Sequence, residues 1–323
     1  MKKFIFGIIL IILSGAASLA AQPDKIDCKT AGDCYAAGVA AYEKGDVQAD
    51  IQYCTKAIEL QPDYVKAYNN RCMAYGLLDK YELSIKDCTR AIELKPDYAE
   101  AYYNRGLAYA KAGKYLNLAV ADCTKAIELK PDDPRAYYNR GLVYYKVGKY
   151  DLAVTDYTKA IAMQPDDDKN YYNRGLAFAM ENQYDLAVLD FTKAIELKPD
   201  DGQNYYNRAL TYSILGKYDL AVADYGKVIE LKPGDAEAYT NLCMTQIYTT
   251  EYETAIKDCT KAIELQPGLA EAYNDRGLGY AMIGEYDLAI KDFDKCIELD
   301  PDGKIGKKSK EARDYVLKVQ SQK

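Results

Sequence analysis

The sequence predicts an all-α fold, an elongated solenoid in which pairs of helices pack one on the next. The first observation is a series of prolines 34 residues apart, with a single step of 35 between Pro96 and Pro131. The second is that each interval holds two segments whose small and aromatic residues recur at helical spacing, with a turn residue such as Gly148 between them. Helices of about three to four turns are marginal alone in water, so these segments must pack against their neighbours.

Every interval repeats the same residue types in the same places. We number positions so that the closing proline is position 32, and call the first helix of each copy helix A and the second helix B. Position 4 is Tyr68, Tyr102, Tyr137, Tyr171, Tyr205, Tyr239 and Tyr273, and position 27 is small, as in Ala57, Ala91, Ala126, Ala160, Ala194 and Ala262. Small residues let two antiparallel helices approach closely, and aromatic rings fill the space between copies.

This 34-residue helix–turn–helix period resembles the tetratricopeptide repeat (TPR) family. The resemblance covers residues 31–303 as eight copies, and it implies one right-handed α-solenoid domain with a concave groove lined by the A helices. Copy one is degenerate, as expected of a terminal copy, with Cys34 at position 4. The extra residue of copy three falls near Tyr115, where we expect the turn between its two helices.

The end of the chain has the pattern of a solvating cap. Residues 304–323 are predicted to form a cap helix and a tail that close the last copy. The predicted apolar stripe of this helix consists of Ile305, Ala312, Tyr315, Val316 and Val319.

An arginine at position 7 departs from the leucine that is usual in the family. It occurs as Arg71, Arg105, Arg140, Arg174, Arg208 and Arg276, and position 23 is Asp87, Asp122, Asp156, Asp190, Asp224, Asp258 and Asp292. Copy one lacks both groups and only copy seven keeps the aspartate alone, so pairing within a copy fits better than pairing between copies. We interpret these pairs as structural devices that specify the packing, with a small net effect on stability.

Another face of helix A is the candidate partner-binding site. Positions 5, 6 and 9 lie towards a side that would be polar if it were merely solvated, yet they carry tyrosine, asparagine and leucine. The candidate residues are Tyr103, Asn104, Leu107, Tyr138, Asn139, Leu142, Tyr172, Asn173, Leu176, Tyr206, Asn207 and Leu210. The resemblance places them in the concave groove, where each amide would offer a donor and an acceptor to an extended peptide. The alternative is that they only pack neighbouring A helices together.

The carboxylate clamp of chaperone-tail-binding family members is absent. That clamp uses lysine at position 5 and asparagine at position 9, where this chain has mainly tyrosine or asparagine, then leucine or methionine.

Nine cysteines invite disulfides in an exported chain. Cys28 and Cys34 flank the start of the first helix and could join. Position 8 is cysteine only in copies where position 24 is also cysteine, which suggests the bridges Cys72–Cys88 and Cys243–Cys259. The alternative is that each cysteine is simply a small buried apolar residue, as expected for Cys54, Cys123 and Cys296.

The first residues differ in composition from all that follow. Lys2 and Lys3 precede an apolar run and then small residues, which is typical of a secretory signal peptide over residues 1–21, cleaved after Ala20 or Ala21. The alternative is a retained membrane anchor, although the run is short for one. No cysteine follows in the place that a lipoprotein signal requires. We therefore expect an exported protein, periplasmic or secreted, with a short lead over residues 22–30 and no membrane insertion after cleavage.

Composition narrows the function further. The absence of histidine removes imidazole bases and ligands, and no cysteine spacing is typical of a zinc site. A net charge of −7 argues against nucleic acid as a partner. We expect no enzyme, no cofactor and no metal, but a scaffold that binds a protein or peptide segment in its groove. The alternative is a self-assembling structural element, because a homo-oligomer is compatible with this architecture.

Overall fold

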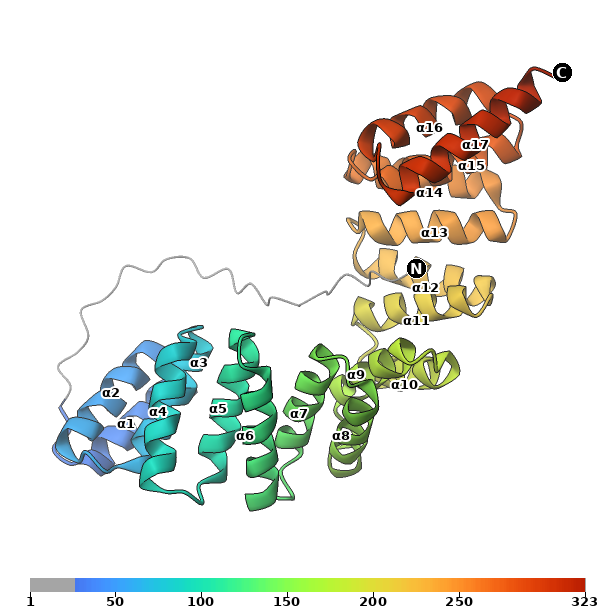
Figure 1. The fold of residues 1–323 in the computed structure, drawn as a ribbon. Helices are drawn as coiled ribbons and strands as arrows, with labels where there is room; N and C mark the ends of the chain where they lie inside the picture. Colours follow the sequence, from blue (N-terminus) through green and yellow to red (C-terminus); the bar gives the residue numbers. More distant parts are fainter. Residues whose placement is uncertain (1–26, 323) are drawn as a thin grey trace. The chain divides into compact units, whose positions relative to one another are not determined.

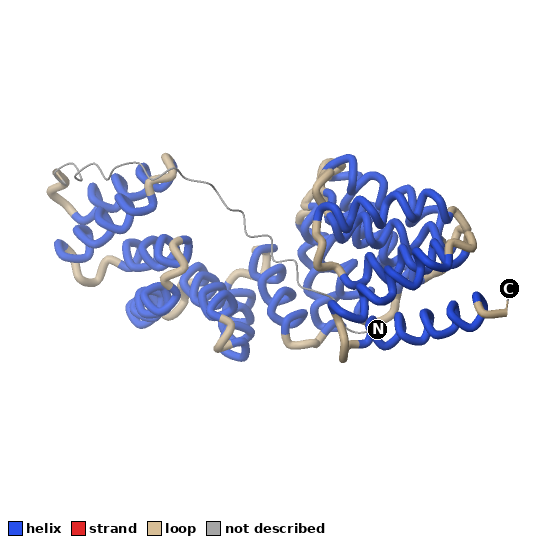
Figure 2. The backbone as a smooth tube through the Cα atoms, turned by 90° about the horizontal axis from the view of Figure 1, so that it is seen from above, coloured by secondary structure: helices blue, strands red, loops and turns tan. Residues whose placement is uncertain are grey.

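A computed structural model describes residues 27–322, and within that range the chain is helical with no strand (Figures 1 and 2). The A helices are α1 (Ala31–Glu43), α3 (Val65–Leu77), α5 (Ala99–Ala112), α7 (Pro134–Lys146), α9 (Asp168–Met180), α11 (Gly202–Ile214), α13 (Ala236–Tyr248) and α15 (Ala270–Met282). The B helices are α2 (Val47–Leu60), α4 (Tyr81–Leu94), α6 (Leu116–Leu129), α8 (Tyr150–Met163), α10 (Tyr184–Leu197), α12 (Tyr218–Leu231), α14 (Tyr252–Leu265) and α16 (Tyr286–Leu299). The cap helix is α17 (Lys304–Gln320).

The chain forms two compact units, Met1–Ala112 and Gly113–Lys323, and each is described by itself. Consecutive helices pack on each other from α1 to α5 in unit one and from α6 to α17 in unit two. This succession of packed helix pairs confirms the predicted all-α solenoid. The prediction of a single domain over residues 31–303 stays a prediction.

The signal peptide expected over residues 1–21 lies outside the described residues. Among the helices of residues 27–322, none is both long and apolar enough to cross a lipid bilayer.

Small residues at position 8 are required by the rings beneath them. A Cβ atom on Gly141 would lie 2.8 Å from a ring carbon of Tyr157, and one on Gly175 would lie 2.9 Å from a ring carbon of Phe191. Both rings are fully buried and cannot move aside. The close approach of helices A and B therefore depends on glycine in these copies, as the sequence predicted.

The turn between helices A and B needs a left-handed residue at position 15. Glycine supplies it in five copies, including Gly148 with a φ of 76°. In the other three copies the residue is Asp79, Asn182 or Thr250, with φ between 56° and 65°. Aspartate and asparagine tolerate this conformation, whereas the β-branched Thr250 is strained there.

The extra residue of copy three lies in the turn between its two helices. Gly113 keeps the left-handed φ of position 15, at 72°, and two residues separate it from the start of α6, whereas one residue separates Asp79 from the start of α4. The insertion therefore lengthens the turn, where the sequence predicted it.

The arginine at position 7 holds its own copy's aspartate with two hydrogen bonds. In copy five, Arg174 Nε and Nη2 each donate to Asp190 at 2.8 Å. The same geometry occurs in Arg71–Asp87, Arg140–Asp156, Arg208–Asp224 and Arg276–Asp292. Pairing within a copy is thereby confirmed for these five copies.

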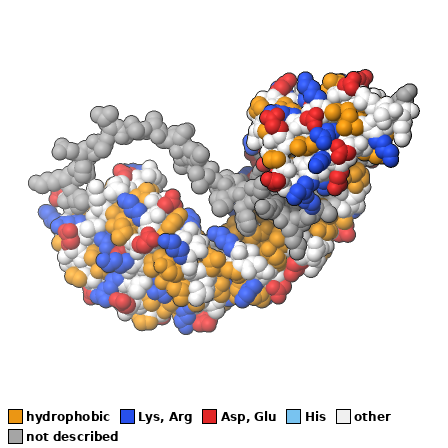
Figure 3. All heavy atoms as spheres, turned by 45° about the horizontal axis from the view of Figure 1, so that its top comes forward, with side chains coloured by type: hydrophobic (Ala, Val, Ile, Leu, Met, Phe, Trp, Pro, Cys, Tyr) orange, Lys and Arg blue, Asp and Glu red, His pale blue; other side chains and the backbone are white. Residues whose placement is uncertain are grey.

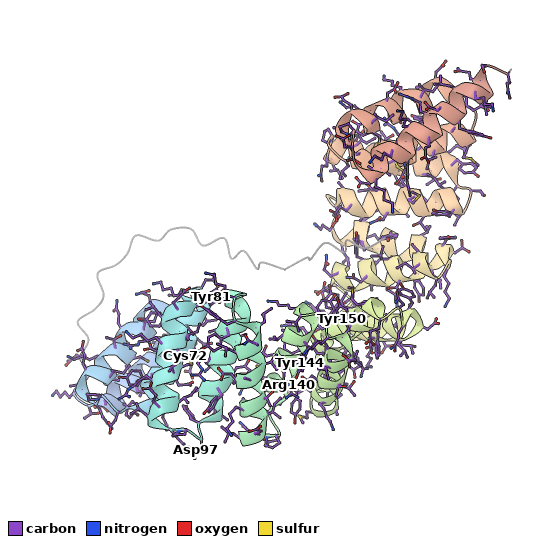
Figure 4. All side chains as sticks on the ribbon, viewed as in Figure 1. Cys72, Tyr81, Asp97, Arg140, Tyr144 and Tyr150 are labelled. Atoms are coloured by element: carbon purple, nitrogen blue, oxygen red, sulfur yellow. A yellow bond between two sulfur atoms is a disulfide. The ribbon has the colours of Figure 1, made fainter. Side chains whose placement is uncertain are left out.

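The same guanidinium also joins neighbouring copies, a contact that the sequence did not predict. Arg174 Nη1 donates to Thr158 of the preceding copy at 3.0 Å, and the group lies 5.7 Å from the ring centroids of Tyr171 and Phe178. Arg140 lies in the same way beside Tyr144 on α7 (Figure 4). In copy seven the arginine is replaced by Leu242.

The cap helix occupies the place of a ninth A helix. It packs on α15 and α16 and buries Gly306, Ser309 and Val316. Tyr315 was predicted to lie on its buried stripe, and this is wrong, because its side chain is 69% exposed. Its position corresponds to position 12 of a repeat, and within the described residues α17 packs on α15 and α16 alone, so this side of the helix is uncovered.

Candidate partner-binding face

The candidate site is built from hydrogen-bonded rungs between successive A helices. In unit two the amides of three asparagines at position 6 donate to the tyrosine hydroxyl at position 5 of the preceding copy. Asn173 donates to Tyr138 at 3.2 Å, Asn207 to Tyr172 at 3.2 Å, and Asn241 to Tyr206 at 2.9 Å. We call the surface formed by positions 5, 6, 9 and 13 of the A helices of unit two the ladder face.

Two of these asparagines have no donor capacity left for a partner. Asn173 also donates to the Lys169 carbonyl at 2.8 Å, and Asn207 to the Gln203 carbonyl at 2.9 Å. Both amide hydrogens are thus used inside the protein, and the side-chain oxygen is the group left to accept from a ligand. The sequence had suggested that the amide would also donate.

The tyrosines of the rungs are neutral phenols that also pack against the core. Burial raises the pKa of Tyr172 to about 12, and burial followed by the nearby charge of Glu237 raises the pKa of Tyr206 to about 12. Their rings lie 6.0 Å from Phe191 and 5.8 Å from Tyr225, measured between centroids. The tyrosines that form the rungs therefore also pack A helices onto the core, as the packing alternative expected.

The leucines at position 9 are half-buried rather than exposed. Leu142, for example, packs against the core cluster of Ala153, Tyr157 and Ala177. The exposed apolar side chains lie one turn further along, at position 13. In unit two they are Ile214, Tyr248 and Met282, which are 43%, 58% and 58% exposed, and in unit one Leu77 is 49% exposed. The residues predicted from the sequence did not include them, although the same helical spacing places position 13 beside position 9.

The candidate residues divide between the two units. Tyr103, Asn104 and Leu107 lie on α5 in unit one, where Asn104 donates to Asn69 at 3.0 Å. Asn104 and Leu107 also line a small hollow between α3 and α5 together with Met73 and Leu77. The other nine candidates lie on α7, α9 and α11 in unit two, where Asn139 alone is fully buried.

The six cysteines expected to pair are joined in the structure as the sequence suggested. The Cα atoms are 5.2 Å apart in Cys28–Cys34 and 5.4 Å apart in both Cys72–Cys88 and Cys243–Cys259. The other three, Cys54, Cys123 and Cys296, are buried thiols. Burial raises the pKa of Cys54 and Cys123 to about 12, so these thiols stay protonated and unreactive.

The chemistry of the ladder face is that of recognition. It combines hydroxyl groups, amide oxygens and apolar side chains, and its tyrosines keep their protons at neutral pH. Within residues 27–322, no three metal-binding side chains come together to form a site for an ion.

The fold and this face define a helical-repeat protein of the interaction-scaffold class. Family models described as "Tetratricopeptide repeat" match residues 34–64, 65–98, 88–117, 134–167, 169–201, 204–235, 236–268 and 270–302, and one described as "TPR repeat" matches residues 116–148. These matches cover most of the sequence, and the chain belongs to the tetratricopeptide repeat family.

Similar solved structures share the fold. YrrB, described as a TPR protein with an unusual peptide-binding site, is 25% identical with a TM-score of 0.53, and the alignment covers 58% of this chain and 97% of YrrB. A tetratricopeptide repeat protein from Parabacteroides merdae is 21% identical with a TM-score of 0.54, covering 77% of this chain and 98% of that one.

A curated relative matches a shorter stretch. An uncharacterized protein of Methanocaldococcus jannaschii is 44% identical over 48 residues, which are 15% of this chain. The chain spans about half the length of that relative, 56%.

Proposed function

We propose that this chain is a non-enzymatic scaffold that binds an extended polypeptide segment along the ladder face. The observation that carries the proposal is the combination of polar rungs and exposed apolar side chains on the same A helices. The amide oxygens of Asn173 and Asn207 would accept from backbone N–H groups of the partner. The Tyr172 and Tyr206 hydroxyls accept from asparagine and keep their own hydrogens to donate to backbone carbonyls.

Apolar contacts would supply most of the affinity. Ile214, Tyr248 and Met282 keep between two-fifths and three-fifths of their surface in water, and covering such surface is favourable by about 25 cal/mol per Å². The similarity to YrrB, a protein described by its peptide-binding site, supports the same use of this face.

Selection from a displayed peptide library tests the proposal. The mature protein should enrich peptides that share apolar residues, and Ile214→Glu should lose them because it places a charge among the apolar contacts. Leu288→Glu is the matched control, since Leu288 is 42% exposed but lies on a B helix away from the ladder face. Equal enrichment by wild type and Ile214→Glu would reject the ladder face as the site.

We also propose that the protein acts outside the cytoplasm after removal of residues 1–21. The support is the composition of the N-terminal segment, together with three joined cysteine pairs, which persist in oxidising compartments. N-terminal sequencing of the natural protein should begin at residue 21 or 22. Mass spectrometry after alkylation without reduction should find six cysteines protected and the remaining three modified only after unfolding. A retained N-terminus with nine reactive thiols would reject export.

A further inference from the structure

The B helices of unit two carry leucines where a merely solvated face needs none. Position 19 is Leu118, Leu152, Leu186, Leu220 and Leu288 in five of its copies, all between 38% and 49% exposed. Helix α10 adds Leu189 at position 22, which is 65% exposed. Space-filling shows hydrophobic side chains among the charged ones on the surface of the molecule (Figure 3). Leu186 and Leu189 are three residues apart and therefore lie together on one side of α10, and clustered apolar exposure is a mark of a binding surface.

The charges on the outer face of α10 reverse along the helix. Asp185, Leu189 and Lys193 are four residues apart, so they follow one another on one face from the first turn to the third. The neighbouring B helices repeat the order with smaller centres, as Asp151, Thr155 and Lys159 on α8 and Asp219, Ala223 and Lys227 on α12. Each helix therefore presents an acid, a neutral centre and a base.

A pattern of this kind is complementary to itself. Two copies related by a twofold axis through Leu189 would place α10 antiparallel to the partner's α10. Each aspartate at position 18 would then face a lysine at position 26 of the other copy, and the exposed leucines would meet at the centre. Isologous contacts of this type are the commonest way in which identical chains pair.

Asp185 and Lys193 already form ion pairs within the chain, but these pairs are exposed and weak. Lys193 and Glu196 form an ion pair with side chains that are 44% and 59% exposed, and Lys217 reaches Asp185 only at 3.4 Å, with Asp185 80% exposed. Exposed ion pairs contribute at most about 1 kcal/mol, so an incoming partner can exchange them.

We propose that two copies of this chain associate through the outer face of α10, with α8 and α12 at the flanks. This contact uses B helices, whereas the ladder face belongs to the A helices, so each copy in such a dimer retains its own ladder face. The proposal does not depend on peptide binding.

Sedimentation equilibrium of the mature protein over a range of concentrations tests this contact. Wild type should rise from the mass of one chain towards twice that mass. Leu189→Glu should weaken association by at least about tenfold, because it puts two acids at the centre of the contact. Leu288→Glu, an exposed leucine on α16 outside the contact, should associate as wild type does.

A charge exchange makes the test specific. Asp185→Lys alone should abolish association, since lysine would face lysine, and adding Lys193→Asp should restore it. Circular dichroism confirms that each variant is helical. A wild type that stays at the mass of one chain, a dimer that Leu189→Glu leaves intact, or a double variant that fails to recover would each overturn the proposal.

Discussion

At the scale of single residues, the arginine of position 7 links two kinds of contact. Its two hydrogen bonds to aspartate fix helix A against helix B, and its third, to threonine, fixes one copy against the preceding copy. Copy seven loses the arginine and its threonine partner together, while it keeps the aspartate as Asp258. Leu242 replaces the arginine there, and Gly226 stands where the preceding copy would have supplied the threonine.

Removing one charge of such a pair should cost far more than removing an exposed charge. Asp190→Asn leaves Arg174 partly buried without its counter-ion, and we expect the free energy of unfolding to fall by about 3 kcal/mol. Glu196→Gln on the same helix breaks only an exposed pair and should change it by less than about 0.5 kcal/mol. Urea denaturation measures both changes in the free energy of unfolding, and equal changes would show that the buried pair contributes no more to stability than the exposed pair.

Thr250 is the residue whose replacement should stabilise the protein. Its φ of 65° is costly for a β-branched side chain, and Thr250→Gly should raise the free energy of unfolding by roughly 1 kcal/mol after the entropy cost of glycine. The adjacent Thr249 has a φ of −86°, so Thr249→Gly should lower stability. Thermal melting of both variants checks the prediction, which a drop for Thr250→Gly would contradict.

At the scale of elements, the cap helix α17 covers a buried acid. Asp275 replaces the asparagine of position 6, is 3% exposed and accepts a hydrogen bond from Asn274 at 2.9 Å. Asn274 in turn accepts from Ser309 of α17 at 2.7 Å, which continues the rungs into the cap. Burial, together with the smaller effect of Glu271, raises the pKa of Asp275 to about 7, while the hydrogen bond from Asn274 and the charge of Lys308 oppose the shift.

Asp275 should make the last copy of the solenoid less stable as pH rises. Between about pH 4 and pH 7 the unfolded chain loses the Asp275 proton while the folded chain keeps it, so stability falls across that window. Asp275→Asn should therefore be more stable than wild type at pH 8, and the gap should shrink towards pH 5. Melting curves at both pH values measure it, and a gap independent of pH would refute the assignment.

How far the sequence predicts these elements depends on what each pattern determines. The proline period and the small residues at position 8 predict the helix pairs, because close packing of helix A on helix B is the arrangement that buries the small residues. The burial of Tyr315 was predicted wrongly, because an apolar stripe on one helix does not reveal which side of that helix packs on a neighbour. The rungs were also unseen, because whether Asn173 turns towards Tyr138 or towards solvent depends on the rotation between copies, which no single copy encodes.

At the scale of the whole molecule, the family and the fold identify an interaction scaffold, and the ladder face is where we place its partner. The rungs show why the choice of variant matters. Replacing Asn173 or Asn207 would loosen the packing of α9 or α11 as well as any binding, whereas Ile214 makes no such bond and is 43% exposed.

Crosslinking in the native cells, followed by affinity purification and mass spectrometry, tests the central claim most directly. Wild type, Ile214→Glu and Leu288→Glu would be compared at equal abundance. The account predicts a protein partner captured by wild type and by Leu288→Glu but lost from Ile214→Glu. A partner captured equally by all three would contradict it and place binding away from the ladder face.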